Sequence, residues 1–416
     1  MKYTGLLLLV IVFCVIFVFV GCSILPTSQR EEAENGADDS QSNKVPLQNT
    51  IKDYSTFATG TPLFNDISVS ANSAILCTDD GTLLFEKNAD VPLPMASITK
   101  VMSAIVALEM ITDLSELVCV DNRAVGIEGS SVYLNAGEAV TYEMLLYSSL
   151  LESANDATTA LAIAVSGSVE DFVLEMNRKA QQLSMSSTHF CNPHGLNENE
   201  HFTTARDYAR LMAYALDDPT FCSIIATKKA VFQKSDKSMY RVLTNHNRLL
   251  NTYKGMLGGK TGFTKASGRT LVTAACRNET TLICVTLNAS NDWNDHTLML
   301  DRGFNAVKSV AFDREMLLET VNVAAGSSDT VAVKLAQTVK FTLKANEQVT
   351  YSLTLPHILF APVKAGQVVG RAEFYNGENL LKTVDLIAAK DVDEPEIERE
   401  KTSIFARIIS FFKQKE

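Results

Sequence analysis

Apolar residues follow two different periods along this chain. From residue 97 to residue 216 they recur at helical spacing, as on a helix packed along one side. Before and after this stretch, apolar runs of strand length are bounded by turn residues. Strands come first and last with helices between them, so we expect an α+β domain whose sheet is closed by both of its ends. The predicted helices are 97–110, 142–152, 156–166, 169–183, 204–216 and one near 293–309; the predicted strands are 73–78, 82–86, 270–276 and 281–287.

From about residue 314 the pattern changes to short β-like runs separated by Gly and Asn turns. This pattern predicts a separate small all-β domain over 314–390. Its predicted strands are 321–324, 330–335, 339–343, 348–355, 368–374 and 380–387.

Residues 1–22 have the pattern of an export signal. Leu6–Val20 is an almost uninterrupted apolar run, shorter than the roughly 20 residues of a membrane-spanning helix. It ends in Gly21-Cys22-Ser23, which resembles a bacterial lipobox, with Phe19 where an aliphatic residue is usual. A lipobox would make Cys22 the lipidated N-terminus; an uncleaved anchor and ordinary cleavage are the alternatives, and all three export the protein. Residues 23–55 are polar and predict a linker.

The other end, 391–416, combines an acidic linker with an amphipathic helix. Its apolar residues fall at helical spacing, and basic and polar residues fill the other face. Such a helix suits the interface of a membrane, and docking on the protein's own surface is the alternative. The apolar positions are Ile404, Phe405, Ile408, Phe411 and Phe412.

Charge and composition exclude several classes of protein. The chain has 37 Lys and Arg against 48 Asp and Glu, a formal charge of −11, and 46% hydrophobic residues. This balance argues against a nucleic-acid surface, global disorder and a polytopic membrane protein. The six cysteines beyond the export segment show no metal-ligand spacing, and we expect them to be unpaired. Cys276 and Cys284 fall on opposite faces of their predicted hairpin.

Candidate chemistry begins at Ser97 and Lys100, which open an apolar helix. Residues three positions apart share a helix face, so the Lys100 amine can reach the Ser97 hydroxyl. A serine needs a base to act as a nucleophile, and a lysine serves when burial keeps it neutral. Alone the pair is weak support, because Ser-x-x-Lys occurs by chance about once in a chain this long. Ser410 and Lys413 form a second such pair.

Two further motifs follow in order. Ser153-Ala154-Asn155 lies in the predicted break between two helices, although Ser70-Ala71-Asn72 matches the same pattern. Lys260-Thr261-Gly262 follows Gly258-Gly259 and opens the second strand region. In this order and setting, the three motifs resemble those of penicillin-binding proteins and serine β-lactamases.

Finer features resemble one branch, the low-molecular-mass D-alanyl-D-alanine carboxypeptidases. Their S-G-N-D-A segment is matched by residues 153–157, with Ala154 for the usual Gly. Their N-P-H-G-L and T-A-x-D segments are matched by 192–196 and 204–207. The K-T-G segment continues into Phe263 and Thr264, with Arg269 where an aromatic residue is common.

The resemblance implies a transpeptidase fold, an antiparallel sheet with a helical cluster, followed by a small all-β domain. It covers about residues 60–310, and the later β-rich stretch and tail helix fit the family's C-terminal domain and membrane anchor. Anchors at both termini would hold the exported protein close to the outer face of the bacterial cytoplasmic membrane. The expected divisions are 1–22 export signal, 23–55 linker, 56–313 catalytic domain, 314–390 β domain and 391–416 linker and anchor helix.

The resemblance also implies a reaction on peptidoglycan pentapeptides ending in D-Ala-D-Ala. Ser97 would attack the penultimate carbonyl with Lys100 as its base, and Ser153 would hydrogen-bond Lys100 and relay a proton to the leaving amine. β-Lactam antibiotics would acylate the same serine. No cofactor, metal or nucleic acid is implied.

The remaining motif residues are implied in substrate binding. Asn155 would hold the peptide backbone, and Lys260 and Thr261, in the motif with Gly262, would bind the terminal carboxylate. The oxyanion hole would consist of the Ser97 and Phe263 N–H groups. His246 and Arg248 lie just upstream, where either adds positive potential or belongs to the surface.

Two alternatives stay open at this stage. A class A-like β-lactamase needs S-D-N and a deacylating Glu; Ala154 stands in place of that Asp, and Glu198 and Glu200 lie between the second and third motifs. A non-catalytic sensor that binds β-lactams or the wall would have a degenerate site. The cluster of His189, His194 and His201 favours loop-shaping roles over metal binding.

Overall fold

A computed structural model describes residues 54–234 and 239–395 of the chain. The predicted export signal, most of the linker after it and the tail helix lie outside the described residues, as does the second Ser-x-x-Lys pair. Among the described residues no single helix has the length and apolarity to cross a membrane. One bent pair of helices, Asn155–Ser166 and Val169–Gln182, passes that test together, at an angle of 86°.

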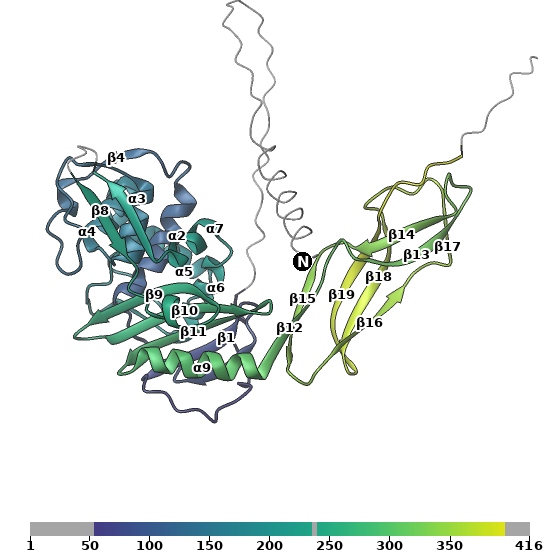
Figure 1. Cartoon of the computed structure of the whole chain (residues 1–416), viewed down its shortest axis with the longest axis horizontal. Coiled ribbons are helices and arrows are strands. Elements are labelled where there is room, and N and C mark those ends of the chain that lie inside the picture. The colour runs from purple at the N-terminus through teal and green to yellow at the C-terminus, as the bar shows by residue number, and fades with distance from the viewer. Residues whose placement is uncertain (1–53, 235–238, 396–416) are drawn as a thin grey trace, which may run out of the picture. The chain divides into compact units, whose positions relative to one another are not determined.

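A five-stranded antiparallel sheet forms the centre of the α+β domain (Figure 1). Its first hairpin pairs with its last: Ser73 lies opposite Leu287. The expectation of a sheet closed by both ends of the domain is therefore confirmed. In spatial order the strands are β2 (Leu83–Lys87), β1 (Ser73–Thr78), β11 (Thr280–Ala289), β10 (Gly268–Arg277) and β9 (Met256–Thr264).

The last hairpin also settles the cysteine prediction. Cys276 lies opposite Thr281, and Cys284 lies opposite Thr273, so the two thiols occupy opposite faces of the sheet. The six cysteines among the described residues are all free, as the sequence predicts.

The two faces of the sheet are covered by different helices. Alternate residues point to opposite faces, so Val272 and Ala274 join the core around helix α6 (Ala205–Ala215). Their neighbour Leu271 joins Met299 and Leu300 of helix α9 (Asp292–Ala306), which runs along the sheet in Figure 1. Helix α9 ends three residues before the predicted position, because strand β12 begins at Val307.

The remaining helices form the cluster that carries two of the three motifs. The predicted helix from 97 begins as a 3-10 turn, η1 (Ala96–Thr99), and continues as α2 (Lys100–Met110). Side chains of Thr141, Ser168 and Thr204 accept hydrogen bonds from N–H groups of the first turns and fix where α3, α5 and α6 begin. The other elements are α3 (Tyr142–Leu151), α4 (Asn155–Ser166), α5 (Val169–Gln182), η2 (Asn122–Ala124), α8 (Leu249–Thr252), β3 (Leu93–Pro94), β4 (Leu117–Cys119), β5 (Ala139–Thr141) and β6 (Phe202–Thr203).

Besides strand β9, helix α8, the 3-10 turn η2 and the short strands β3 to β6, three further elements of this domain are absent from the sequence prediction. Helix α7 (Pro219–Ala226) begins with Pro after a capping Asp218, and strands β7 (Lys229–Gln233) and β8 (Tyr240–Thr244) pair as an antiparallel ribbon. The ribbon packs on α3, where the ring centroids of Tyr147 and Phe232 are 5.4 Å apart.

The C-terminal region is all-β, as predicted, and each predicted strand is present. Strand β12 (Val307–Phe312) pairs with β15 (Val339–Lys344), although the predicted boundary at 313/314 falls between them. That boundary stays a prediction. The other six strands form one sheet, in the order β16 (Val349–Thr354), β18 (Val368–Asn376), β19 (Asn379–Ala388), β14 (Thr330–Leu335), β13 (Leu317–Ala324) and the unpredicted β17 (Ile358–Phe360).

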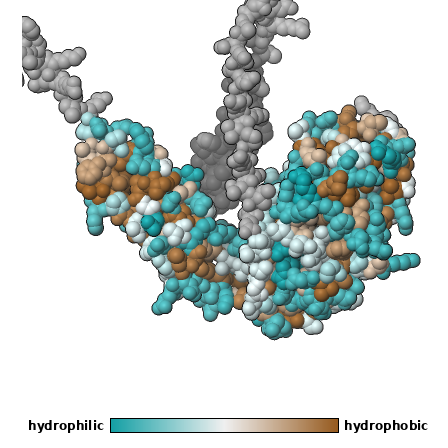
Figure 2. Space-filling view, turned by 180° about the vertical axis from the view of Figure 1, so that it is seen from behind, coloured by the Kyte–Doolittle hydropathy of each residue, from teal (hydrophilic) through white to brown (hydrophobic). Residues whose placement is uncertain are grey.

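Apolar side chains also lie on the surface of this C-terminal region, which carries broad apolar areas at the left of Figure 2. Its large exposed apolar residues are Met316, Leu317, Tyr351, Ile358, Phe360, Val368, Leu380 and Leu381.

Candidate functional site

The Ser97–Lys100 pair sits where η1 passes into α2. Lys100 Nζ lies 3.1 Å from Ser97 Oγ, as the three-residue spacing predicts. The ammonium group also donates to Asn155 Oδ1 at 2.7 Å and to the His194 carbonyl at 2.6 Å. Three acceptors from separate parts of the chain therefore hold the lysine against the serine.

Burial depresses the pKa of the Lys100 amine. Its side chain is fully buried, and this burial lowers the pKa of Lys100 well below 10.5. The charge of Lys260 lowers the pKa further, and the carboxylate of Asp156 opposes the shift. A lysine with a lowered pKa is neutral for more of the time at neutral pH, and only the neutral amine can accept a proton from Ser97.

The two polar residues of the second motif differ in position: Ser153 lines the pocket, and Asn155 is buried beside it. Ser153 has a positive φ of 59° in the break before α4 and lines the pocket. The family resemblance implies a hydrogen bond between Ser153 and Lys100. Among the described residues, Lys100 instead bonds to Ser97, Asn155 and His194. Asn155 is buried; besides accepting from Lys100 it donates to the Glu128 carbonyl at 2.6 Å. Asn155 thus orients the base in this structure instead of facing the pocket.

The third motif follows strand β9 along one wall of the pocket. Thr261, Gly262 and Phe263 line it, and the Phe263 side chain is 67% exposed. Lys260 is only 1% exposed; its Nζ donates to the Thr261 carbonyl at 2.9 Å, and burial lowers its pKa to about 7. The Lys260 amine is therefore buried beside the pocket, and its assignment to the substrate carboxylate stays a prediction.

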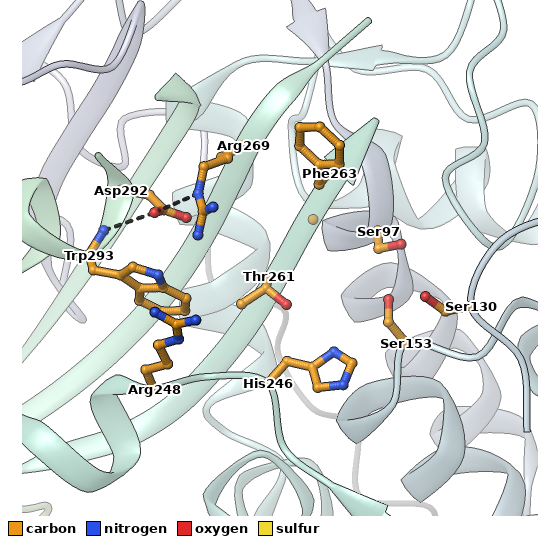
Figure 3. A pocket seen from close by; sticks show the side chains of 11 residues that line it. Ser97, Ser130, Ser153, His246, Arg248, Thr261, Phe263, Arg269, Asp292 and Trp293 are labelled. Atoms are coloured by element: carbon orange, nitrogen blue, oxygen red, sulfur yellow. Dashed lines mark hydrogen bonds and ion pairs between the residues drawn. The ribbon is translucent and has the colours of Figure 1, made fainter. Parts of the chain in front are cut away.

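The pocket between these walls encloses about 350 Å³. Figure 3 shows Ser97, Ser130 and Ser153 on one side, facing Thr261 on β9. Ser130 was missed by the sequence analysis; its carbonyl accepts from the Asn155 N–H at 2.7 Å, a long-range contact that no local pattern reveals.

Basic side chains gather at the end of the pocket beyond Thr261 (Figure 3). Arg269 Nε pairs with Asp292 at 2.9 Å, and His246 lies 3.3 Å from Glu152. Arg248 is exposed, and no hydrogen bond or ion pair of its guanidinium occurs within 54–234 and 239–395.

Trp293 lines the same end of the pocket as these basic side chains, and the sequence analysis missed both it and Asp292. As the only Trp of the chain, Trp293 offered one compositional signal. This arrangement can bind an anionic ligand at one end of the pocket and hold it near a serine that Lys100 can activate.

Backbone contacts fix the turn that carries Ser97. Ala96 has a positive φ of 51°, a conformation that costs an alanine energy and persists only where surrounding contacts impose it. Thr270 Oγ1 donates to the Met95 carbonyl at 2.9 Å, and Tyr208 donates to the Ile98 carbonyl. The residues on both sides of Ser97 are thus tied to the sheet and to α6.

The three histidines of the 189–201 loop have structural contacts. Burial lowers the pKa of His194 to about 3 and of His201 to about 4, and the charge of Lys100 contributes to both shifts. Glu198, weighed above as a deacylating residue, accepts from Asn192 at 2.7 Å and does not line the pocket. No three His, Cys, Asp or Glu side chains of the described chain group as metal ligands would.

Comparison with known proteins agrees with this geometry. Residues 57–291 match the D-alanyl-D-alanine carboxypeptidase family, and residues 304–394 match the C-terminal domain of penicillin-binding protein 5. The chain is 34% identical to D-alanyl-D-alanine carboxypeptidase DacC of Escherichia coli, over 79% of this chain and 85% of that protein. It is 28% identical to DacF of Bacillus subtilis, over 79% and 87% of the two chains.

A solved structure extends the comparison to the fold. Penicillin-binding protein 5 of Haemophilus influenzae superposes with a TM-score of 0.63 at 26% identity, covering 81% of this chain and all of that one. The likeness spans both the α+β domain and the β-rich region, so the predicted transpeptidase fold followed by a small all-β domain is confirmed. The chain therefore belongs to the D-alanyl-D-alanine carboxypeptidase family of hydrolases.

Proposed function

We propose that this protein removes the terminal D-Ala from peptidoglycan stem pentapeptides through an acyl-serine intermediate on Ser97. The observation that carries the proposal is the buried Lys100 amine, 3.1 Å from Ser97 Oγ and depressed in pKa. β-Lactams acylate the same oxygen in this proposal, because they offer a strained amide to the same nucleophile.

The proposed reaction has two halves. As Ser97 Oγ bonds to the penultimate D-Ala carbonyl carbon, its proton passes to Lys100. The C–N bond to the terminal D-Ala then breaks, and Ser153 relays a proton to the leaving amine. Water next attacks the ester and restores Ser97. The N–H groups of Ser97 and Phe263 stabilise the oxyanion in both halves, each such donor being worth about 3–4 kcal/mol in the transition state.

The terminal carboxylate is assigned to Thr261 and Arg248, with the charge of the buried Lys260 nearby. Arg248 is the exposed, unpaired cation of the described pocket, whereas the Lys260 amine is buried against the Thr261 carbonyl. A charge-assisted hydrogen bond contributes about 1.5–3 kcal/mol, so Arg248→Gln should raise KM for the pentapeptide about tenfold or more. With a substrate amidated at its C-terminus the same variant should lose little. Arg302→Gln, on the surface of α9, is the control; an equal loss on both substrates would contradict the assignment.

The deciding experiment incubates the protein with a peptide ending in Lys-D-Ala-D-Ala. We expect release of D-Ala and an acyl adduct on Ser97 by mass spectrometry, both lost in Ser97→Ala. Binding of muropeptide without D-Ala release would favour a sensor. Rapid turnover of a penicillin, in place of a long-lived acyl-enzyme, would favour a β-lactamase.

The cellular location follows from segments outside the described residues. We propose that the protein is exported and held at the outer face of the cytoplasmic membrane by the basic amphipathic helix that the sequence predicts after residue 400 and by a lipid on Cys22. Fractionation of the full chain, of a chain ending at residue 400 and of Cys22→Ala separates the two anchors. Full release of the chain ending at residue 400 would show that Cys22 alone does not anchor.

A further inference from the structure

A chain of three hydrogen bonds runs behind the nucleophile, outside the pocket. The Cys191 N–H donates to His201 Nδ1 at 3.0 Å, and His201 Nε2 lies 2.8 Å from Thr99 Oγ1. The Thr99 hydroxyl donates to the Ala96 carbonyl at 2.7 Å. His201 and Thr99 are both buried, and neither lines the pocket.

The Cys191 N–H fixes which group donates and which accepts in each of these hydrogen bonds. A backbone N–H can only donate, so His201 Nδ1 must be unprotonated. Neutral His201 then carries its proton on Nε2, as its pKa of about 4 allows at neutral pH, and donates to Thr99 Oγ1. The Thr99 oxygen is thereby occupied as an acceptor and turns its own proton to the Ala96 carbonyl.

The Ala96 carbonyl controls the orientation of one catalytic donor. The Ala96 C=O and the Ser97 N–H belong to one planar trans peptide unit and point in opposite directions. Holding the carbonyl toward Thr99 therefore turns the Ser97 N–H the other way. Strand β9 lies close on the nitrogen's other side, since a Cβ atom on Gly262 would come within 2.9 Å of it.

Close packing supports the same peptide unit from behind. Gly195 has a φ of +90°, and a Cβ atom there would lie 2.0 Å from the Ala96 oxygen. The 189–201 loop thus approaches the Ala96 carbonyl through Gly195, whose added Cβ would also lie 2.9 Å from Thr99 Oγ1. The positive φ of Ala96 is the conformation that these contacts impose.

We propose that His201 is a positioning residue for acyl transfer, which acts through Thr99 to orient the Ala96–Ser97 peptide so that the Ser97 N–H meets the developing oxyanion. The inference rests on the proposed function of Ser97. It predicts that breaking the chain lowers the rate of the chemical step without weakening the encounter with substrate, since an oxyanion donor acts in the transition state.

Thr99→Val tests this inference most directly, because it keeps the shape of the side chain and removes its hydroxyl. We expect the acylation rate constant with a β-lactam to fall about tenfold or more, part of the ~10²–10³-fold attributed to a whole oxyanion donor. The dissociation constant of the non-covalent complex should not change. Thr99→Ser should restore the rate, and His201→Phe should repeat the loss.

A spectroscopic readout separates orientation from packing. In an acyl-enzyme with a ¹³C-labelled ester carbonyl, hydrogen bonds from the oxyanion hole lower the stretching frequency. Thr99→Val and His201→Phe should therefore move this infrared band to higher frequency, and Thr99→Ser should leave it in place.

The chain offers a matched control in a second buried histidine. His296 contacts Thr273 Oγ1 at 2.8 Å and Thr286 Oγ1 at 3.0 Å, between the sheet and α9. Thr286→Val should lower Tm while leaving the acylation rate constant and the carbonyl band unchanged. Equal effects of Thr286→Val and Thr99→Val, or no effect of Thr99→Val, would overturn the inference. Failure of the wild-type protein to form acyl-Ser97 would overturn the proposed function itself, and this inference with it.

Discussion

The catalytic domain and the C-terminal β domain bury different kinds of side chain. From residue 54 to residue 306 the described interior contains buried lysines, aspartates and histidines, among them Lys100, Asp156 and Lys260. Between residues 307 and 395 every buried side chain that the structure describes is apolar. The β domain can thus be stabilised by hydrophobic burial alone, whereas the catalytic domain must also satisfy buried polar groups with hydrogen bonds.

The difference shows where function is placed. Buried charges cost stability unless each finds partners, so a fold keeps them where they serve a purpose. In this chain, Lys100 and Lys260 lie next to the pocket, and each has a lowered pKa. The described part of the β domain buries no charged side chain. Such an interior suits a spacer or platform more than a reaction site.

The largest expected effect is on catalysis, from Lys100→Met. Without the base, the rate of Ser97 acylation should fall on the order of 10³-fold. Stability should change little, because relief from burying an amine offsets the loss of two hydrogen bonds to the Asn155 and His194 oxygens. Acylation kinetics and thermal unfolding measure the two quantities. A large drop in Tm with an unchanged acylation rate would show that Lys100 serves stability and not catalysis.

Phe374→Ala should have the opposite effects in the β domain. Phe374 is buried, with ring centroids 4.9 Å from Phe312 and 5.2 Å from Phe341. Its removal should lower the free energy of unfolding by about 3–5 kcal/mol. Denaturant unfolding measures this loss, and the acylation rate of the folded protein should not change. A slower acylation would mean that the β domain takes part in catalysis.

Asp156→Asn tests how much a buried carboxylate contributes to the fold. Asp156 accepts from Ser131 Oγ at 2.7 Å and from the N–H groups of Leu134 at 3.0 Å and Val132 at 3.1 Å. An amide cannot accept all three, so we expect a loss of about 1–3 kcal/mol in denaturant unfolding. Asp171→Asn, on the exposed start of α5, should cost less, about 1 kcal/mol at most, because it keeps the backbone N–H that Ser168 caps. Equal losses would contradict the special role of the buried group.

The smallest effect is a shift in pH dependence. Acylation needs neutral Lys100, so its rate falls as pH drops through the pKa of Lys100. The charge of Lys260 lowers that pKa, and Lys260→Met should therefore move the acidic limb of the pH–rate profile to higher pH. Asp156→Asn should move it to lower pH, because the carboxylate raises the same pKa. Lys340→Met, in the β domain, is the control; shifts in one common direction would refute this electrostatic account.

The sequence predicts most of the fold because the apolar residues of most elements recur at helical or strand spacing. The alternation in the β domain and the apolar helices around 97–216 locate nearly every long element. Helix α7 was missed although Asp218 and Pro219 form a start signal. Strands β7 and β8 carry no comparable signal, since they are short, partly exposed and depend on packing against α3.

The candidate site is predictable only where it is local. The spacing of Ser97 and Lys100 gives their contact directly. The contact of Asn155 with Lys100 and the burial of Lys260 depend on how distant segments meet, and sequence spacing contains neither. His201 illustrates the same limit: its role depends on a hydrogen bond to Thr99 across half the domain.

The pairing of the first hairpin with the last has a consequence for the order of folding. Ser73 has no strand partner on the β11 side until Leu287 has been synthesised, and β9 reaches β1 only through β10 and β11. Contacts so far apart in sequence form slowly and late. In a nascent or truncated chain that stops before β11, the turn that carries Ser97 should therefore lack the pocket wall formed by β9. A fluorescent penicillin should label only chains that extend past β11.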